Sequence, residues 1–85
     1  MEPTTIRVRV RCFSHLRYEL GTDAFDLELP AGSTLGQASE RILERAAGKL
    51  EGLPFRMALN GEFSEAGATL SAGDEVALIP PVQGG

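Results

Sequence analysis

The chain has 85 residues and a mass of 9.1 kDa, which is enough for one small domain with one modest core. Hydrophobic residues make up 42% and charged residues 24% of the sequence, a composition typical of folded globular proteins rather than disordered ones. Twelve acidic residues against eight basic ones give a formal net charge of −4. Because nucleic-acid binding depends on an excess of lysine and arginine, no nucleic acid is expected among the partners.

Several other classes of protein are also disfavoured. No apolar run approaches the roughly 20 residues of a membrane-spanning helix, and the residues from Met1 to Thr5 do not have the pattern of a signal peptide. The single Cys12 excludes an intramolecular disulfide and cysteine-rich metal centres, and the single His15 leaves no histidine metal site. We therefore expect a cytoplasmic protein without a membrane partner, a metal or a bound cofactor.

The first half of the chain contains two alternating segments. Ile6–Cys12 alternates apolar and basic residues, and residues 24–29 alternate apolar and acidic ones, so each predicts a strand with one buried face. Ser14 is expected to cap a short helical turn between them, and Gly21 is expected to end it. Phe13 breaks the first alternation and falls on the face that carries the arginines.

The arginine row of the first segment has two interpretations. Arg7, Arg9 and Arg11 could bind an anion or nucleic acid, or they could form the solvated face of a half-buried sheet, balanced by Asp26 and Glu28. No aromatic residues alternate with them as in a base-stacking surface. The solvated face is therefore the favoured interpretation.

A helix is predicted after the second strand. Thr34 and Gln37 have the spacing of a capping box, and Gly48 or Gly52 is expected to end the helix. Its buried stripe has helical spacing and consists of Leu35, Ala38, Ile42 and Ala46.

The second half of the chain predicts a hairpin and a final strand. Residues 55–59 alternate, and Asn60-Gly61 is a strong signal for a tight turn before Phe63 starts the return strand. Leu70 is expected to anchor a loop, and residues 75–79 form the last strand. A segment order of two strands, a helix, two strands and a strand favours an α+β domain over residues 1–85 with a mixed sheet against one main helix. If the first and last strands are adjacent and parallel, this is the β-grasp, or ubiquitin-like, fold.

The C-terminal segment, residues 80–85, has an unusual composition for a tail. Pro80 and Pro81 end the last strand because proline cannot donate to a sheet, and we expect a flexible tail that ends in Gly84 and Gly85. Glycine has no Cβ, so the tail could enter a channel too narrow for other residues. The reactive group it would present is the carboxylate of Gly85. A frayed terminus is the alternative interpretation.

Three segments together resemble the small subunit of molybdopterin synthase, a family of ubiquitin-like sulfur carriers. They are Phe13–Gly21, Asn60–Glu62 and the stretch from Gly73 to Gly85, and the resemblance as a whole runs from Ile6 to Gly85. It implies that a partner enzyme uses ATP to convert Gly85 into an acyl-adenylate, and that sulfur from a donor protein then replaces AMP to give a thiocarboxylate. It also implies that the tail, with Gly84, enters the synthase large subunit, whose residues catalyse sulfur transfer to a pterin precursor. The chain itself would be a non-catalytic subunit.

Partner binding is expected on the sheet face that lies away from the helix. Phe13, Phe63 and Ile79, with Ala77, are predicted to form an exposed apolar patch, because Ala77 and Ile79 alternate with the inward residues of the last strand. The resemblance implies that the family docks its partners through these positions and the prolines that follow them. It also implies that Arg17 pairs with an acidic residue of a partner.

Other functions remain open from the sequence. Carriers for thiamine synthesis or tRNA thiolation, and ubiquitin-like protein modifiers, also end in Gly-Gly. A β-grasp module that binds a nucleotide or RNA is a hypothesis of another class, and the acidic net charge of −4 argues against it.

Overall fold

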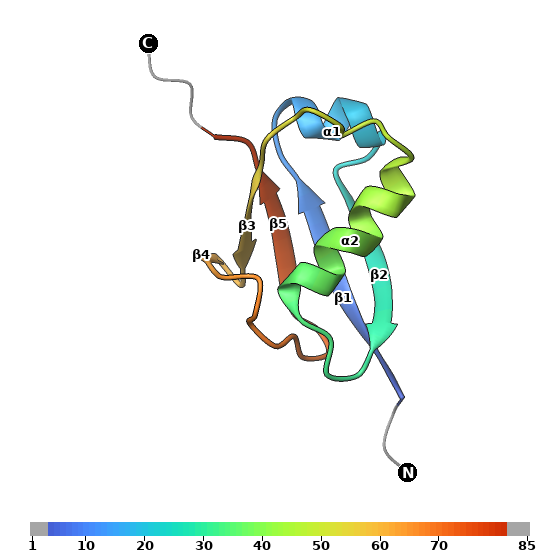
Figure 1. Ribbon diagram of the computed structural model, residues 1–85, viewed down its shortest axis with the longest axis vertical. Coiled ribbons are helices and arrows are strands. Elements are labelled where there is room, and N and C mark those ends of the chain that lie inside the picture. The colour runs from blue at the N-terminus through green and yellow to red at the C-terminus, as the bar shows by residue number, and fades with distance from the viewer. Residues whose placement is uncertain (1–3, 82–85) are drawn as a thin grey trace.

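The computed structural model describes residues 4–81, which form five strands and two helices (Figure 1). In chain order they are β1 (Thr5–Cys12), α1 (His15–Leu20), β2 (Ala24–Pro30), α2 (Leu35–Ala46), β3 (Arg56–Leu59), β4 (Glu62–Phe63) and β5 (Glu75–Ile79). The strands form one sheet in the order β2-β1-β5-β3-β4. β1 and β5 are parallel neighbours, whereas the other neighbouring strands are antiparallel. The predicted β-grasp fold is confirmed.

The core lies between one face of the sheet and α2, which crosses that face (Figure 1). The alternation in β1 and β2 places every second side chain on this face, and the predicted helix stripe faces it from α2. Ile6, Met57 and Leu59 pack against this core but are only partly buried. The fully buried side chains with the largest volume are Leu16, Leu29, Leu35, Ile42, Leu78, Val8, Val10 and Val76.

Helix α2 begins at the predicted capping box. The Gln37 backbone N–H donates to Thr34 Oγ1 over 3.3 Å, and the Thr34 backbone N–H donates to Gln37 Oε1 over 2.8 Å. The predicted helix end is wrong, because α2 stops before Ala47, which is left-handed with φ = 51°. The Ala47 N–H donates to the Glu44 carbonyl, so this turn closes one residue before Gly48, which also has positive φ.

Helix α1 follows β1 and differs from its prediction at one end. Ser14 occupies the N-cap position, but its side chain makes no capping hydrogen bond and its φ is 53°. Gly21 ends the helix in the left-handed conformation, with φ = 73°, as predicted. Within α1, the Leu16 side chain is buried and His15 is exposed.

The turn between β3 and β4 is fixed by local conformation and by long-range contacts. Asn60 and Gly61 both have positive φ, 51° and 89°, as a tight hairpin with a right-handed twist requires. The Asn60 side chain accepts from the Glu75 backbone N–H over 2.9 Å and donates to Asp74 Oδ1 over 3.1 Å. The turn that leads into β4 is therefore tied to the start of β5.

No helix within residues 4–81 has the length and apolar composition that crossing a membrane requires.

Candidate functional site

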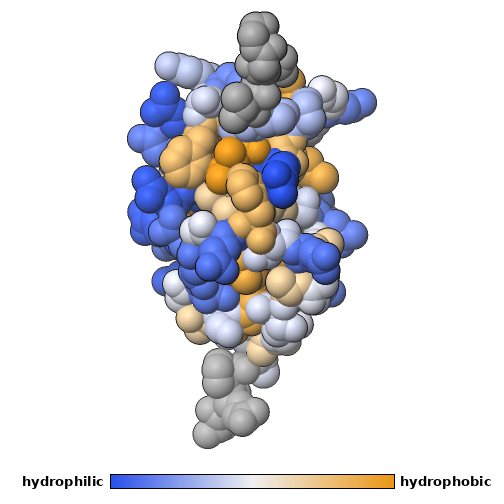
Figure 2. Space-filling view, turned by 90° about the vertical axis from the view of Figure 1, so that its left-hand side faces the viewer, coloured by the Kyte–Doolittle hydropathy of each residue, from blue (hydrophilic) through white to orange (hydrophobic). Residues whose placement is uncertain are grey.

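The last strand, β5, ends beside a groove near the edge of the sheet. β5 ends at Ile79, and the two prolines that follow line a groove of ≈ 310 Å³ together with Arg56 and Phe63. β3 and β4 supply the latter two side chains, so the groove depends on the hairpin held by Asn60. In a view from the side of the molecule where β3 and β4 lie, Figure 2 shows apolar side chains along the middle, with hydrophilic ones on either side. The described residues therefore place an apolar groove where the C-terminal segment begins.

The two aromatic residues predicted for the patch are exposed. Phe63 is 54% exposed and Phe13 is 38% exposed, whereas Ile79 is half-buried. β1 and β5 pair as Arg11 with Ala77 and Cys12 with Leu78, and continuing this register by one residue places Phe13 opposite Ile79. The structure therefore places Phe63 and Ile79 in the groove, whereas Phe13 follows β1 and is not one of the residues that line it.

One member of the predicted patch is not exposed. Ala77 is only 8% exposed and pairs across the strands with Arg11 and Ala58, and Ala58 in turn pairs with Phe63. A methyl group in a central strand is easily covered by the larger side chains beside it on the same face. Ala77 is therefore part of the floor beneath the patch, and the prediction that it is exposed is wrong.

Arg17 does not line the groove. It lies on α1, where its guanidinium is 3.9 Å from Asp23 Oδ1 and 5.7 Å from the centre of the Tyr18 ring. These residues line a separate hollow together with Gly21 and Thr22. Its role toward a partner stays a prediction. Gly84 and Gly85 lie outside the described residues.

The arginine row of β1 pairs with acidic residues, in agreement with the favoured interpretation of a solvated face. The guanidinium groups of Arg7, Arg9 and Arg11 lie 3.9, 3.8 and 3.6 Å from carboxylate oxygens of Glu28, Asp26 and Glu75. All six side chains are at least 45% exposed, so each pair contributes little to stability.

The one cysteine is not placed for catalysis. Cys12 is buried, and burial raises the pKa of its thiol, with the Asp23 carboxylate acting in the same direction and Arg45 opposing it. A raised pKa keeps the thiol protonated and weakly nucleophilic. Within residues 4–81, no three side chains of histidine, cysteine, aspartate or glutamate are grouped so that they could hold a metal ion.

Sequence reasoning missed Arg56 as a member of the site. The signal was present, because alternation places Arg56 and Ala58 on the face opposite Met57 and Leu59. Its guanidinium carbon lies 4.0 Å from the centre of the Phe63 ring, which is a cation–π contact.

The fold and the groove define a protein of the ubiquitin-like β-grasp class, with its candidate docking surface at the root of the C-terminal segment. The chain matches the model of the ThiS family over residues 10–85. It belongs to this family and is a β-grasp sulfur carrier, of a kind that is typically non-catalytic.

Individual relatives point to more than one role. A molybdopterin synthase sulfur carrier subunit from Arabidopsis thaliana is 28% identical over 89 residues, covering 99% of this chain and 88% of the relative. A putative molybdopterin converting factor subunit 1 from Pyrococcus furiosus has a TM-score of 0.85 at 28% identity, covering 91% of this chain and 99% of that one. SAMP1 from Haloferax volcanii has a TM-score of 0.83 at 26% identity, covering 93% and 99%.

A fourth relative has been solved together with a second subunit. The structure is a complex of subunits 1 and 2 of the molybdopterin-converting factor from Helicobacter pylori, with a TM-score of 0.66 at 25% identity. The match covers 94% of this chain and 100% of that one.

Proposed function

We propose that this chain is the small subunit of a molybdopterin synthase and carries sulfur as a thiocarboxylate on Gly85. The observation that supports the proposal most is the Arabidopsis thaliana relative, which is named as such a subunit and aligns with 99% of this chain. The Helicobacter pylori complex supports a second subunit as the partner. The chain would act in the cytoplasm.

The partner would bind at the groove, in a position that lets the C-terminal tail reach the partner's active site. Phe13, Phe63 and Ile79 offer apolar anchors, the side-chain types that carry most of the energy in interfaces. Pro80 and Pro81 restrict the conformations of the segment that leaves β5, which lowers the entropy lost when the tail is threaded into a channel.

The chemistry of the tail requires two partner enzymes. A carboxylate is a poor electrophile, so an adenylating enzyme first transfers AMP from ATP to the Gly85 carboxylate and releases pyrophosphate. The terminal sulfur of a persulfide on a donor protein then attacks the carbonyl carbon, and AMP leaves. Cleavage of the resulting acyl disulfide by a second thiol leaves the thiocarboxylate on Gly85.

Gly84 and Gly85 would supply reach and the reacting carboxyl group, and the catalytic side chains would belong to the partners. The large subunit would receive the tail and transfer its sulfur to the pterin precursor. ATP would bind to the adenylating enzyme, so this chain itself would hold no cofactor.

Mass spectrometry tests the proposal directly. The chain is incubated with the adenylating enzyme, ATP and a persulfide donor, and the C-terminal peptide is expected to gain the mass difference between sulfur and oxygen. A chain that lacks Gly85 serves as the matched control and is expected to gain no sulfur while keeping its thermal stability. The proposal is wrong if the intact chain never gains sulfur, or if the shortened chain still supports pterin sulfuration by the large subunit.

A second candidate function is a ubiquitin-like protein modifier. SAMP1 is named as a small archaeal modifier protein, and it resembles this chain with a TM-score of 0.83. In that role, the activated Gly85 would be attacked by a lysine amine of a target protein and would form an isopeptide bond. Carriers for thiamine synthesis or tRNA thiolation would share the thiocarboxylate but deliver its sulfur elsewhere. Isopeptide-linked conjugates, pterin sulfuration and the two other acceptors therefore separate these roles.

A further inference from the structure

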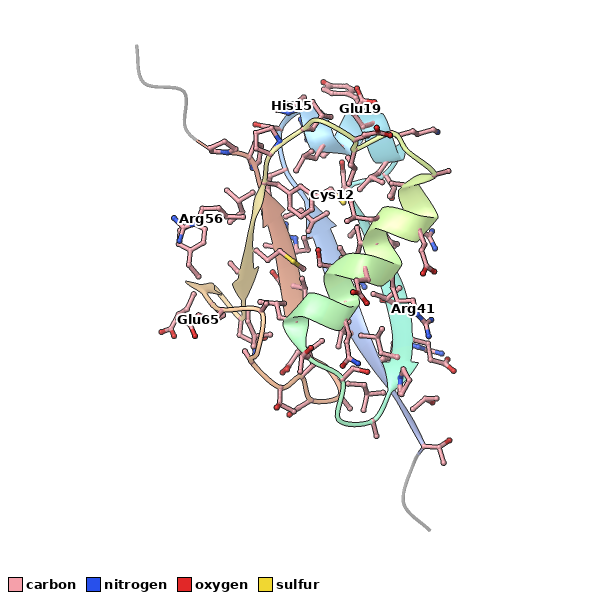
Figure 3. The ribbon with its side chains drawn as sticks, in the orientation of Figure 1. Cys12, His15, Glu19, Arg41, Arg56 and Glu65 are labelled. Carbon is pink, nitrogen blue, oxygen red and sulfur yellow. The ribbon has the colours of Figure 1, made fainter. Side chains whose placement is uncertain are left out.

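Arg56 lines the groove, and its side chain is restrained by contact with Phe63. It lies on β3 directly across from Ile79 on β5, and its guanidinium packs on the ring of Phe63 at 4.0 Å. It also lines the groove that Pro80 and Pro81 border. Figure 3 shows the Arg56 side chain projecting from β3 away from α2. A flexible cationic side chain is thus held beside the apolar surface proposed for docking.

Arg56 differs from the arginines of β1 and α1 in its ion pairing. Arg7, Arg9 and Arg11 on β1 each have a carboxylate oxygen within 4.0 Å, and so does Arg17 on α1. Within residues 4–81, Arg56 has no such partner. Glu65 follows β4 on the same side of the molecule (Figure 3), but it forms no ion pair with Arg56. Among the described residues, the face of the Phe63 ring is therefore the group that contacts the guanidinium charge.

Docking would change the surroundings of this charge. A partner that covers Phe63 and Ile79 also removes water from the guanidinium that is stacked on Phe63. An arginine remains charged in proteins, and burying a charge without a counter-charge is strongly unfavourable. A partner that fits this surface must therefore supply an acceptor for Arg56.

We infer that Arg56 determines which partners fit the docking surface, by pairing with an aspartate or glutamate carboxylate on the synthase large subunit. Contact with the Phe63 ring restrains the guanidinium at 4.0 Å from the ring centre, and a guanidinium can make a two-point contact with a carboxylate. Phe63 and Arg56 then act as one unit in which the ring provides apolar contact and the guanidinium provides charge recognition. This inference rests on the proposed function.

Two charge reversals test the inference against a matched control. Arg56→Glu and Arg41→Glu each lower the formal net charge by two, from −4 to −6. Arg41 is exposed on α2, whereas Arg56 projects from the other side of the sheet (Figure 3). The dissociation constant of each full-length variant is measured by calorimetry with purified large subunit from the same organism, at low and at high salt. Circular dichroism and thermal melting confirm that each variant is folded.

We expect Arg56→Glu to weaken binding at least about tenfold, and Arg41→Glu to stay within about twofold of the wild type. Arg56→Lys should lose part of the affinity, because lysine keeps the charge without the planar stack. If Arg56→Glu binds like the wild type, or if both reversals weaken binding equally, the inference is wrong although the proposed function stands. If the wild-type chain does not bind the large subunit, the proposed function fails and the inference fails with it.

Discussion

Ile42 lies where α2 meets the sheet, and its side chain has no exposed surface. Ile42→Ala removes three buried carbon atoms and leaves a cavity, so we expect the free energy of unfolding to fall by about 2–5 kcal/mol. Urea denaturation of both proteins measures the change. Leu43→Ala is the control on the same helix, because Leu43 is 44% exposed, and it should change stability by only about 0.5 kcal/mol. Equal losses for the two variants would contradict the assigned orientation of α2.

The raised pKa of the Cys12 thiol predicts that the folded chain loses stability in alkaline solution. Burial raises the pKa of its thiol above the ordinary value of 9.0 in the folded chain, with a smaller contribution from Asp23. As the pH rises through 9, the unfolded chain loses the thiol proton while the folded chain keeps it. This contribution to stability is therefore complete below that pH and is lost above it.

The measurement is the urea midpoint of the wild type and of Cys12→Ala at neutral pH and at about pH 10. The midpoint of the wild type should fall more between the two conditions than that of the variant. All other titratable groups are the same in both proteins, so their contribution cancels in the comparison. An equal fall in both proteins would show that Cys12 does not contribute to the pH dependence.

Single residues were predictable from the sequence where one local rule decides their position. The alternation of β1 and the 3.6-residue spacing of α2 correctly placed Val8, Val10 and Ile42 in the core. Ala77 was not predictable in this way, because its burial depends on the size of its neighbours across the sheet and not on its own alternation. Arg56 was missed because its contact with Phe63 joins two strands through the β3–β4 turn.

At the scale of the elements, the capping box of α2 supports a specific prediction. Thr34→Ala removes the side-chain oxygen that accepts from the Gln37 N–H over 3.3 Å. We expect the free energy of unfolding to fall by about 0.5–2 kcal/mol, measured by urea denaturation. Thr69→Ala, at an exposed position outside the capping box, is the control and should change stability less. If the two substitutions cost the same, the capping contact contributes nothing specific.

The type and order of the elements were correctly predicted, but their ends were not all predictable. Hydrophobic period identifies strands and helices, and Asn60-Gly61 identifies the hairpin because both residues tolerate positive φ. The end of α2 was placed too late, since the sequence rule assigns the left-handed position to glycine whereas Ala47 adopts it here. Ser14 precedes α1 as predicted, but with φ = 53° its side chain makes no capping hydrogen bond.

At the scale of the whole molecule, the two faces of the sheet have different surroundings. One side packs on α2 and forms the core, as Figure 1 shows. The other side is divided between the paired charges of β1 and β2 and the apolar groove beside the end of β5. Exposed pairs of opposite charge keep one half of the face solvated, which directs an apolar partner to the other half. The sequence indicated a charged part and an apolar part of this face. Only the strand order shows that Phe63 lies at the same groove as Pro80 and Pro81.

Phe63 gives the prediction that tests this division. It is 54% exposed in a strand of two residues, so Phe63→Asp should alter the free energy of unfolding by no more than about 1 kcal/mol. The same substitution places a carboxylate in the apolar surface and removes the ring that supports Arg56. We expect it to weaken binding to the large subunit and to the adenylating enzyme at least about a hundredfold, the loss typical of a central aromatic anchor.

Leu43→Asp is the matched control for Phe63→Asp, because it introduces the same charge at an exposed apolar residue of α2, and α2 covers the other face of the sheet. It should leave both affinities within about twofold of the wild type, since an exposed charge far from an interface has little effect. Calorimetric titration of each variant with each enzyme gives the four affinities, and thermal melting shows whether the fold is kept. Loss of binding in Phe63→Asp alone would place the docking surface at the groove. Loss in Leu43→Asp with normal binding by Phe63→Asp would move it to the helix side, where the apolar residues of the groove would have no part in docking.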